Sequence, residues 1–461
     1  MKYNKTYIFG ITLVATLGGL LFGYDTAVIS GAEKSIQAYL IIPLGLSTFI
    51  HGATVSSALI GCIIGGIISG MFSNRFGRKK TLLIAAVLFF ISALGSGYPE
   101  TFIFTKGEPS ISLLLFFNFY RIIGGIGVGL ASAVSPMYIS EIAPADIRGR
   151  LVSFNQFAII FGMLVVYFVN WGIAFGQSIE WINDIGWRYM FASEAIPAAL
   201  FGILLFLVPE TPRYLVLSNC DEKALSVLNK INTDKQRAQT IFSEIKQSIG
   251  LVTERSNIFA YGKVVILIGV LLSVFQQFVG INVALYYAPR IFESMGAAKD
   301  ASMLQTIIMG FVNVVFTVVA ILTVDKWGRK PLLITGSMGM ALGMFAISWL
   351  SYNEIIGIST LVFIIIYTAS FMMSWGPICW VLISEIFPNK IRGQAVAIAV
   401  AAQWAANYLI SSTYPAMMEY SGALTYGFYG IMAVLSALFV WKMVPETKGK
   451  SLENMEKLWR K

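Results

Sequence analysis

The sequence predicts an all-α membrane protein with twelve transmembrane helices in two six-helix halves. Three observations support this prediction: the composition, a series of long apolar runs and an internal repeat. The chain has 461 residues, of which 57% are hydrophobic and 12% are charged, with a mean hydropathy of +0.73. Because soluble domains are close to a quarter charged, this composition indicates a polytopic membrane protein.

Twelve apolar runs have the length of about 20 residues that a helix needs to cross a bilayer. We expect helices rather than strands, because backbone groups in hydrocarbon must be satisfied within the segment. The first run follows Lys2 and Lys5 and could suggest a signal peptide, but it is longer than a signal's apolar region, so we expect a retained helix. The predicted spans are 8–30, 49–71, 81–98, 112–136, 151–175, 187–208, 262–287, 302–324, 332–351, 356–382, 393–413 and 421–444.

The basic residues predict the orientation of these spans. Of the 33 Lys and Arg residues, 27 fall at the termini and in the loops on the same side as the termini, and five fall in the opposite loops. By the positive-inside rule, both termini are therefore cytoplasmic. The net charge of +9 reflects this topology and requires no nucleic-acid partner.

Three motifs occur twice in the same order, which predicts two related halves. SNRFGRKK, SEIAPADIRGR and PETPRYL, which begin at 73, 140 and 209, return as VDKWGRKP, SEIFPNKIRGQ and PETKGKSL, which begin at 324, 384 and 445. The polar segment between the halves has apolar residues at three- and four-residue spacing, which predicts short amphipathic helices. The predicted organisation is an N-terminal bundle (1–209), a cytoplasmic helical linker (210–261), a C-terminal bundle (262–444) and a cytoplasmic tail (445–461).

The repeated motifs place basic turns and acidic helix ends on the predicted cytoplasmic side of each half. We expect ion-pair networks that hold the halves together when the protein faces outward and that break when it opens inward. The alternative is that the basic loops only signal topology. The candidate gate residues are Arg75, Arg78, Glu141, Arg148, Glu210, Arg213, Asp325, Arg329, Glu385 and Arg392.

Three charged residues lie inside predicted spans and away from the span ends: Asp25 in the first, Arg121 in the fourth and Glu194 in the sixth. A charge at the bilayer centre costs about 2.5–3.5 kcal/mol on insertion scales, which makes such residues functional candidates. We expect Asp25 and Arg121 to form a pair. A carboxylate stays ionised beside arginine and is protonated when it loses that partner in an apolar site, so making and breaking the pair would bind and release a proton. A permanent pair that fixes helix packing is the alternative.

Uncharged polar side chains recur in spans of both halves and predict a binding cavity between them. Amide donors and acceptors beside aromatic rings suit a ligand with many hydroxyls and apolar C–H faces, which describes a sugar. For each amide alone, an interhelical hydrogen bond worth about 1 kcal/mol is the alternative. The residues are Gln156, Gln276, Gln277, Asn282, Asn313, Gln403 and Asn407, accompanied by Tyr286, Tyr287, Trp380 and Trp404.

Two breaks are predicted in the helices that carry these residues. At 100° per residue, Gln276, Gln277 and Asn282 of a regular helix would point in widely different directions, so one cavity could not receive all three. An unwound turn at Gly280 would bring Asn282 toward the same ligand, and transporters place their sites at discontinuous helices. Gly376–Pro377 predicts a second break, in the tenth span.

Little in the sequence indicates an enzyme, a metal site or a cofactor other than the coupling proton. There is one histidine, His51, and the three cysteines, Cys62, Cys220 and Cys379, form no framework. The glycine run GGIGVG at 124–129 lies within a span with no strand before it, so it predicts close helix packing rather than a dinucleotide loop.

RFGRK, PETPRYL, the paired SEI and RG motifs, FQQFVGIN and PETKGK resemble the sugar porter family of the major facilitator superfamily over nearly the whole chain. TLGGLLFGYDTAVISG and YRIIGGIGVGLAS are most similar to the bacterial xylose/proton symporters of that family. The resemblance implies the major facilitator fold, an alternating-access cycle, a bacterial cytoplasmic membrane and a monomer as the functional unit. It implies D-xylose as the substrate and a proton as the coupling ion.

The resemblance also implies roles for individual residues. Asp25 would be the proton-coupling carboxylate, with Arg121 as its partner and Glu194 nearby. Met163 departs from the pattern, because the xylose symporters have a glutamine there, so D-glucose or another aldose is the alternative substrate. The implied sugar contacts are Phe22, Gln156, Gln276, Gln277, Asn282, Tyr286, Asn313, Trp380, Gln403 and Trp404.

Three other classes of function are weighed against symport. A facilitative uniporter is disfavoured by Asp25, because the related animal glucose carriers have an uncharged residue at that position. A sugar sensor would carry a long cytoplasmic tail, whereas only the segment 445–461 follows the last span. A membrane enzyme is the weakest alternative, because no nucleophile–base pair or metal-ligand cluster is evident.

Overall fold

The computed structural model describes residues 3–101, 103–144, 147–250, 259, 261–294, 296–355, 357–388, 391–448 and 459. Within these residues, twelve helical segments are long and apolar enough to cross a membrane, one at each predicted span. The predicted all-α class and twelve-span organisation are therefore confirmed. Several helices extend well past the predicted ends, because polar residues such as Glu33 and Lys34 continue the first helix.

The N-terminal half contains the first six spans. Three of these spans, the first, second and sixth, are divided into shorter helical segments. Asn4 and Ser110 cap the first and fourth spans with their side-chain oxygens, which accept hydrogen bonds from otherwise unpaired N–H groups of the first turn. The helices are α1 (Lys5–Ile36) with η1 (Gln37–Ile41), α2 (Thr48–Val55) with α3 (Ser57–Phe76), α4 (Arg78–Gly97), α5 (Ile111–Ile142), α6 (Arg148–Ala174), and α7 (Ile179–Trp181), η2 (Ile182–Gly186), α8 (Trp187–Ser193) and α9 (Ala195–Leu207).

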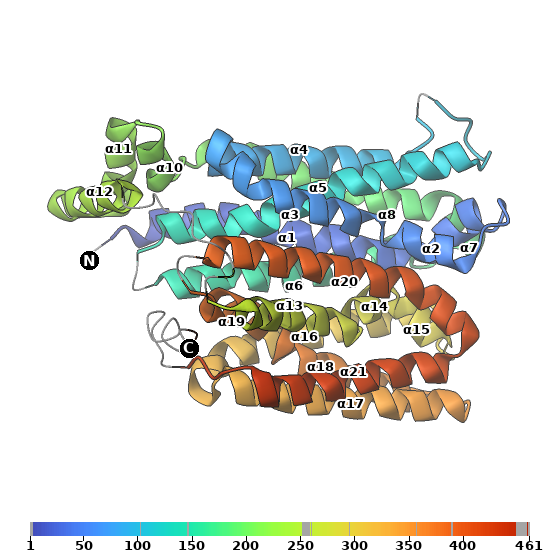
Figure 1. The fold of residues 1–461 in the computed structure, drawn as a ribbon. Helices are drawn as coiled ribbons and strands as arrows, with labels where there is room; N and C mark the ends of the chain where they lie inside the picture. Colours follow the sequence, from blue (N-terminus) through green and yellow to red (C-terminus); the bar gives the residue numbers. More distant parts are fainter. Residues whose placement is uncertain are drawn as a thin grey trace.

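The C-terminal half contains the other six spans, and the linker precedes it. In Figure 1 the two halves lie side by side, and the linker helices project beyond one end of both. The helices are α10 (Pro212–Leu217), α11 (Asp221–Ile231) and α12 (Lys235–Gly250) of the linker, then α13 (Lys263–Phe278), α14 (Ile281–Tyr286), α15 (Ala288–Ser294), α16 (Lys299–Trp327), α17 (Arg329–Tyr352), α18 (Ile358–Met372), α19 (Trp375–Ile386), α20 (Arg392–Tyr420) and α21 (Gly422–Met443). We call the end that carries α10–α12 the linker end and the opposite end the loop end.

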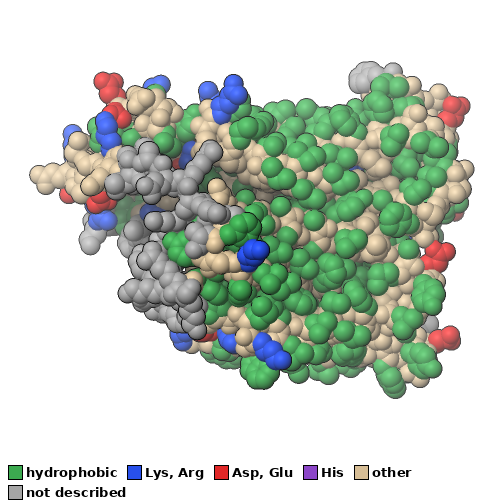
Figure 2. All heavy atoms as spheres, viewed as in Figure 1, with side chains coloured by type: hydrophobic (Ala, Val, Ile, Leu, Met, Phe, Trp, Pro, Cys, Tyr) green, Lys and Arg blue, Asp and Glu red, His purple; other side chains and the backbone are tan. Residues whose placement is uncertain are grey.

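The outer surface of the bundle is apolar along the spans. Figure 2 shows hydrophobic side chains over the middle of the molecule and charged side chains gathered near its two ends. Large side chains such as Ile196, Leu207 and Leu322 expose 75%, 77% and 65% of their surface. A surface of this kind requires hydrocarbon rather than water as its neighbour.

Small residues set the packing distance between helices inside the N-terminal half. A Cβ added to Gly125 of α5 would lie 1.8 Å from the carbonyl oxygen of Ala58 on α3, so only glycine permits this approach. Gly61 on α3 faces Ile122 and Gly125 in the same way. The prediction that GGIGVG packs helices rather than binding a nucleotide agrees with this geometry.

Candidate functional site

A cavity lies between the two halves, near the middle of the spans. Helices α1 and α6 of the N-terminal half and α13, α14, α18, α19 and α20 of the C-terminal half line it. Nine of the ten predicted sugar contacts lie on its wall: Phe22, Gln156, Gln276, Gln277, Asn282, Tyr286, Trp380, Gln403 and Trp404. The tenth, Asn313 on α16, is buried but is not among the lining residues.

The amides on the C-terminal wall form one connected hydrogen-bond chain. Gln403 Nε2 and Gln277 Nε2 both donate to Gln276 Oε1, at 2.5 Å and 3.1 Å. Asn282 Nδ2 donates to Gln277 Oε1 at 2.5 Å. Gln403 Oε1 is buried with no hydrogen-bond partner among the described residues. The chain is therefore an oriented set of donors and acceptors that still has an acceptor free for a ligand hydroxyl.

The helix break at Gly280 makes this arrangement possible. Helix α13 ends at Phe278, Gly280 adopts a left-handed conformation with φ of 89°, and α14 begins at Ile281. Tyr367 on α18 donates from its hydroxyl to the carbonyl of Val279 at 2.8 Å, which satisfies one backbone group that the break frees. The predicted break at Gly280 is confirmed, and it brings Asn282 onto the same wall as the glutamines.

The second predicted break lies slightly before the proline. Helix α18 ends at Met372 and α19 begins at Trp375, so Pro377 lies in the first turn of α19, where a missing N–H does no harm. Gln276 Nε2 donates to the carbonyl of Trp375 at 2.9 Å and to that of Gly376 at 3.3 Å. The amide chain is thereby anchored to both broken helices.

The N-terminal wall of the cavity is more apolar than the C-terminal wall. Gln156, Ile160 and Met163 follow one face of α6, at spacings of four and three residues. Met163 exposes 7% of its surface and lines the cavity. The residue that departs from the expected glutamine therefore lies on the wall of the predicted sugar site. The ring of Phe22 lies 5.6 Å from that of Trp404, which joins the two walls by an aromatic contact.

Sequence reasoning missed part of the lining. Thr26 lies one turn after Phe22 on α1, and Ile159 and Met372 supply apolar wall that carries no distinctive sequence signal. Asn407 lies one turn after Gln403, and its Nδ2 contacts the hydroxyl of Tyr286 at 3.4 Å. Asn407 was among the amides that the sequence predicted for the cavity, whereas Thr26, Ile159 and Met372 were missed.

The three charged residues predicted well inside the spans lie together inside the N-terminal half. Arg121 Nη1 on α5 donates to Asp25 Oδ1 on α1 at 2.8 Å, and the two side chains expose 2% and 0% of their surface. Glu194, at the junction of α8 and α9, exposes 1% and interacts electrostatically with both. Among the described residues, no N–H or hydroxyl group donates to the Glu194 oxygens or to Asp25 Oδ2, and the two carboxyl groups lie within hydrogen-bonding reach of each other. The predicted Asp25–Arg121 contact is therefore present, with a second carboxyl group beside it.

The repeated motifs form matching networks at the linker end. In the N-terminal half, Arg78 Nη2 donates to Glu141 Oε1 at 2.8 Å, and the Thr211 hydroxyl donates to Glu141 Oε2 at 2.6 Å. The C-terminal half repeats this geometry: Arg329 Nη2 donates to Glu385 Oε1 at 3.0 Å, and the hydroxyl of Thr447 donates to Glu385 Oε2 at 2.6 Å.

The acids of the PET motifs cap the helices that follow the basic turns. Glu210 accepts from the backbone N–H groups of Arg78 and Lys79, and Glu446 accepts from those of Arg329 and Lys330. Burial raises the pKa of Glu210. Burial also acts to raise the pKa of Glu446, but the backbone N–H donors outweigh it and hold that pKa below its ordinary value of 4.5.

These networks differ from the expected link between the halves. Each ion pair that the motifs make among the described residues lies within one half, because the acid and base come from neighbouring helices of that half. Arg75, Arg148 and Arg213 are exposed, and no ion pair joins them to another described side chain. The side chains of Asp325 and Arg392 lie outside the described residues. The two ion pairs that the structure describes in these motifs, Arg78–Glu141 and Arg329–Glu385, each join helices of one half, and the role of the motifs as a gate stays a prediction.

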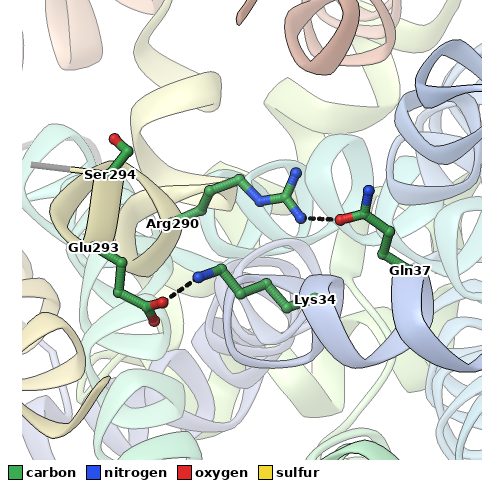
Figure 3. A pocket seen from close by; sticks show the side chains of 5 residues that line it. All are labelled: Lys34, Gln37, Arg290, Glu293 and Ser294. Carbon is green, nitrogen blue, oxygen red and sulfur yellow. Dashed lines mark hydrogen bonds and ion pairs between the residues drawn. The ribbon is translucent and has the colours of Figure 1, made fainter. Parts of the chain in front are cut away.

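Ion pairs between the halves occur instead at the loop end, and sequence reasoning missed them. Arg290 of α15 donates from Nε to Glu33 Oε1 of α1 at 2.8 Å, and Lys34 of α1 pairs with Glu293 of α15. Figure 3 shows Lys34 of the first half reaching toward Glu293 of the second, with Arg290 beside them. The sequence signal that could have predicted these ion pairs is the presence of charged residues at 33–34 and at 290 and 293, just after the apolar runs 8–30 and 262–287.

Comparison with known proteins identifies the family. A family model described as "Sugar (and other) transporter" matches residues 11–459. The chain belongs to this family. A D-xylose-proton symporter of Escherichia coli K12 is 55% identical over 99% of this chain and 97% of the relative, and a glucose facilitated diffusion protein of Zymomonas mobilis is 39% identical over 98% and 97%.

The fold of this sugar transporter is shared with a solved structure. The xylose transporter XylE from E. coli, in its inward open conformation, matches with a TM-score of 0.89 at 55% identity, over 98% of this chain and all of that chain. XylE belongs to the major facilitator superfamily, so the predicted family and fold are confirmed. The family and the relatives are transporters, not enzymes.

Proposed function

We propose that this protein is a proton-coupled symporter that imports D-xylose by alternating access. The observation that carries the proton coupling is the buried pair of Asp25 and Arg121, with Glu194 beside it. The similarity to a D-xylose-proton symporter supports the choice of sugar and of coupling ion. A facilitator that only equilibrates sugar has no need for three ionisable groups at this depth.

The sugar would bind between the two walls of the cavity. Its hydroxyls would donate to the free Gln403 carbonyl oxygen and exchange hydrogen bonds with Gln277 and Asn282, while its C–H faces would lie against Phe22 and Trp380. A bound hydroxyl must compete with the amide chain that already satisfies Gln276. Affinity in this conformation is therefore limited, which suits release of the sugar.

The proton would bind at Asp25 when the pair with Arg121 opens. A carboxylate paired with arginine in an apolar site is ionised, and one that loses its partner there is protonated. Glu194, which lies within hydrogen-bonding reach of Asp25, would exchange a proton with it. The paired state seen here is the state after proton release.

Helix α1 links the two sites. It carries Asp25 on the proton side and Phe22 and Thr26 on the sugar wall, within five residues. A shift of α1 that separates Asp25 from Arg121 would therefore also move the sugar wall. Coupling of this kind requires one structural element with two conformations, and the binding of the sugar and of the proton must each shift the equilibrium between them.

Orientation and conformation follow from charge and from the cross-half contacts. The excess of Lys and Arg at the linker end supports a cytoplasmic location for that end and for both termini. Ion pairs close the halves at the loop end, which supports an inward-facing state. We propose a monomeric transporter in the inner membrane of a bacterium.

D-glucose is the second candidate substrate. Met163 gives the N-terminal wall an apolar side chain, and a relative named as a glucose facilitated diffusion protein is 39% identical. One amide fewer in the cavity removes a potential hydrogen bond, worth about 1 kcal/mol, from any sugar hydroxyl on that side.

Uptake in a host that lacks its own sugar transporters tests the proposal. Labelled xylose and labelled glucose are supplied separately, with and without a protonophore. We expect xylose to accumulate above the external concentration and the protonophore to abolish that accumulation. Equal accumulation with the protonophore present would contradict proton coupling, and uptake of glucose alone would contradict the choice of xylose.

A further inference from the structure

Two serine hydroxyls on α4 lie close to the buried charges of the N-terminal half and have no part in the proposed function so far. Ser92 exposes 1% of its surface and Ser96 exposes none. Among the described residues, neither hydroxyl has a hydrogen-bond partner. Thr81 on the same helix is buried too, but its hydroxyl donates to the carbonyl of Gly77 at 2.6 Å. A buried hydroxyl without a partner is costly, so two of them on one helix require an explanation.

Ser92 faces the ion pair of Asp25 and Arg121. A Cβ added to Gly124 of α5 would lie 2.3 Å from Ser92 Oγ and 3.2 Å from Asp25 Oδ1. The two oxygens are therefore no further apart than these two distances together. One water molecule can bridge such a gap with two hydrogen bonds of about 2.8 Å each. The Ser92 hydroxyl can thus reach the carboxylate through a single water.

Ser96 continues this polar line toward the loop end. Helix α4 begins at the linker end, where Glu210 accepts from its first N–H groups, and it packs against α5 and α8 in the N-terminal half (Figure 1). Ser96 lies one turn after Ser92, on the same face of α4. The next residue, Gly97, packs on α8, because a Cβ added to it would lie 2.8 Å from the carbonyl oxygen of Arg188.

A pocket of about 400 Å³ lies at the loop end, where the line of hydroxyls stops. Tyr98, which follows α4, lines it together with Glu100 of the next loop and Arg188 of α8. Lys106 also lines the pocket and exposes 58% of its side chain, so solvent reaches it. Both Nη groups of Arg188 donate to Glu100 at 2.6 Å, so these two charges compensate each other. Only about 9 Å of helix length separates Ser92 from Tyr98.

A third hydroxyl near the buried charges is already fully used. Ser193, which precedes Glu194, donates to the carbonyl of Met190 at 2.6 Å, and its oxygen lies 2.7 Å from the Tyr24 hydroxyl, which therefore donates to it. A hydroxyl can pass on a proton only when it accepts one on its oxygen and releases its own hydrogen to another acceptor. The two α4 serines are free to do both.

We propose that Ser92 and Ser96 relay the coupling proton from the loop-end pocket to the carboxyl groups of Asp25 and Glu194. This proposal rests on the proposed proton symport and adds the route by which the proton arrives. Each hydroxyl accepts a proton from water on its outer side and releases its own hydrogen to water on its inner side. A hydronium ion in the pocket thereby becomes water, and a carboxylate becomes a carboxylic acid.

The relay separates the route of the proton from that of the sugar. The sugar enters between the halves, whereas the proton enters within the N-terminal half, in agreement with the position of Asp25 away from the wall of the sugar cavity. Ser96 is fully buried in this conformation, so the route is closed toward the loop end. A proton released toward the linker end is therefore kept from returning to the outside.

The dependence of transport on external pH tests the relay. The variant is Ser92→Ala with Ser96→Ala, which removes both hydroxyls and keeps the side chains small. The matched control is Ser135→Ala on α5. The Ser135 hydroxyl is also buried and without a partner among the described residues, but it lies against Gly18 of α1, on the linker side of Asp25. The initial rate of xylose uptake into membrane vesicles is measured from acidic to alkaline external pH, together with equilibrium exchange of labelled xylose.

We expect the double variant to need about tenfold more external protons to reach half of its maximal uptake rate, because protonation of the carboxyl groups becomes slow without the relay. Exchange of xylose, which moves no net proton, should stay within about twofold of the wild type, as should both rates of Ser135→Ala. An unshifted pH profile in the double variant would overturn the relay. An equal fall in uptake and exchange would also overturn it, because that result indicates a structural role for the serines.

A pH-sensitive dye inside the same vesicles separates this proposal from the proposed function. A wild-type protein that moves xylose with no change of internal pH contradicts proton symport and the relay together. Acidification by the wild type, with an unshifted profile in the double variant, contradicts the relay alone. Acidification by the wild type, with a shifted profile in the double variant and none in Ser135→Ala, supports both proposals.

Discussion

Replacement of Asp25 by asparagine tests the proton pathway most directly within the N-terminal half. The change keeps the size of the side chain and removes its charge, so Arg121 loses the partner that lies 2.8 Å away. Loss of one member of a buried pair costs about 3–5 kcal/mol when nothing replaces it. Here Glu194 is buried beside the pair and can serve as the counter-charge, so we expect the fold to survive.

The functional effect follows from the energy that the proton supplies. A proton moving down a potential of about 100 mV releases roughly 2.3 kcal/mol, which corresponds to about 50-fold accumulation of sugar for one proton per sugar. Without a titrating group at Asp25, this energy cannot drive xylose. We expect Asp25→Asn to lower the accumulation ratio from that range to about one.

The accumulation ratio is measured with labelled xylose in energised membrane vesicles. Asp300→Asn is the control, because Asp300 is exposed and, among the described residues, pairs only with Lys299. Xylose binding, measured separately, should change by less than about threefold, because Asp25 does not line the cavity. Accumulation above equilibrium by Asp25→Asn would refute the reasoning, and so would an equal loss in the control.

Three further predictions follow from the site and the linker end. Gly280→Ala places a side chain on a backbone with φ of 89°, which costs about 1–2 kcal/mol of strain. The added Cβ would also lie 2.8 Å from the Tyr429 ring, so the uptake rate should fall at least about tenfold, and a wild-type rate would contradict this. Met163→Gln should lower the KM for xylose about fivefold by adding one hydrogen bond; an unchanged or higher KM would contradict this. Glu446→Gln should destabilise the protein by about 1 kcal/mol at pH 7, and by progressively less as the pH falls below 4.5, because the depressed pKa of Glu446 stabilises the fold above its ordinary 4.5 and that contribution is lost as the pH falls through the pKa of the folded state; a thermal shift that stays the same from pH 7 to strongly acidic pH would contradict this.

Much of the fold could be predicted because membrane helices have a strong sequence signal. The lengths of the apolar runs were enough to predict the twelve spans. The break in the seventh span could be predicted at Gly280, because glycine readily adopts the left-handed backbone that is found there. The helix ends were less predictable, because the spans continue into polar residues such as Glu33 and Lys34. Those residues are stabilised by partners from the other half, which local sequence does not encode.

The site could be predicted in its polar part and not in its apolar part. Amides in hydrocarbon are rare enough to stand out, so Gln276 and Gln403 were found, while Ile159 and Met372 look like any lipid-facing residue. Arg78 and Glu141 were expected to link the halves, yet they pair inside one half. A repeat shows which residues share a role in each half, but the partner of a charged side chain is decided by helix packing.

The central claim is that xylose and protons cross the membrane together. Purified protein in vesicles with a pH-sensitive dye inside tests this claim, with no ion gradient imposed and xylose added outside. The proposal predicts that inward xylose movement acidifies the vesicle interior, that L-glucose does not, and that Asp25→Asn abolishes the signal. Labelled xylose that enters the vesicles at the same rate without any change in internal pH would contradict it.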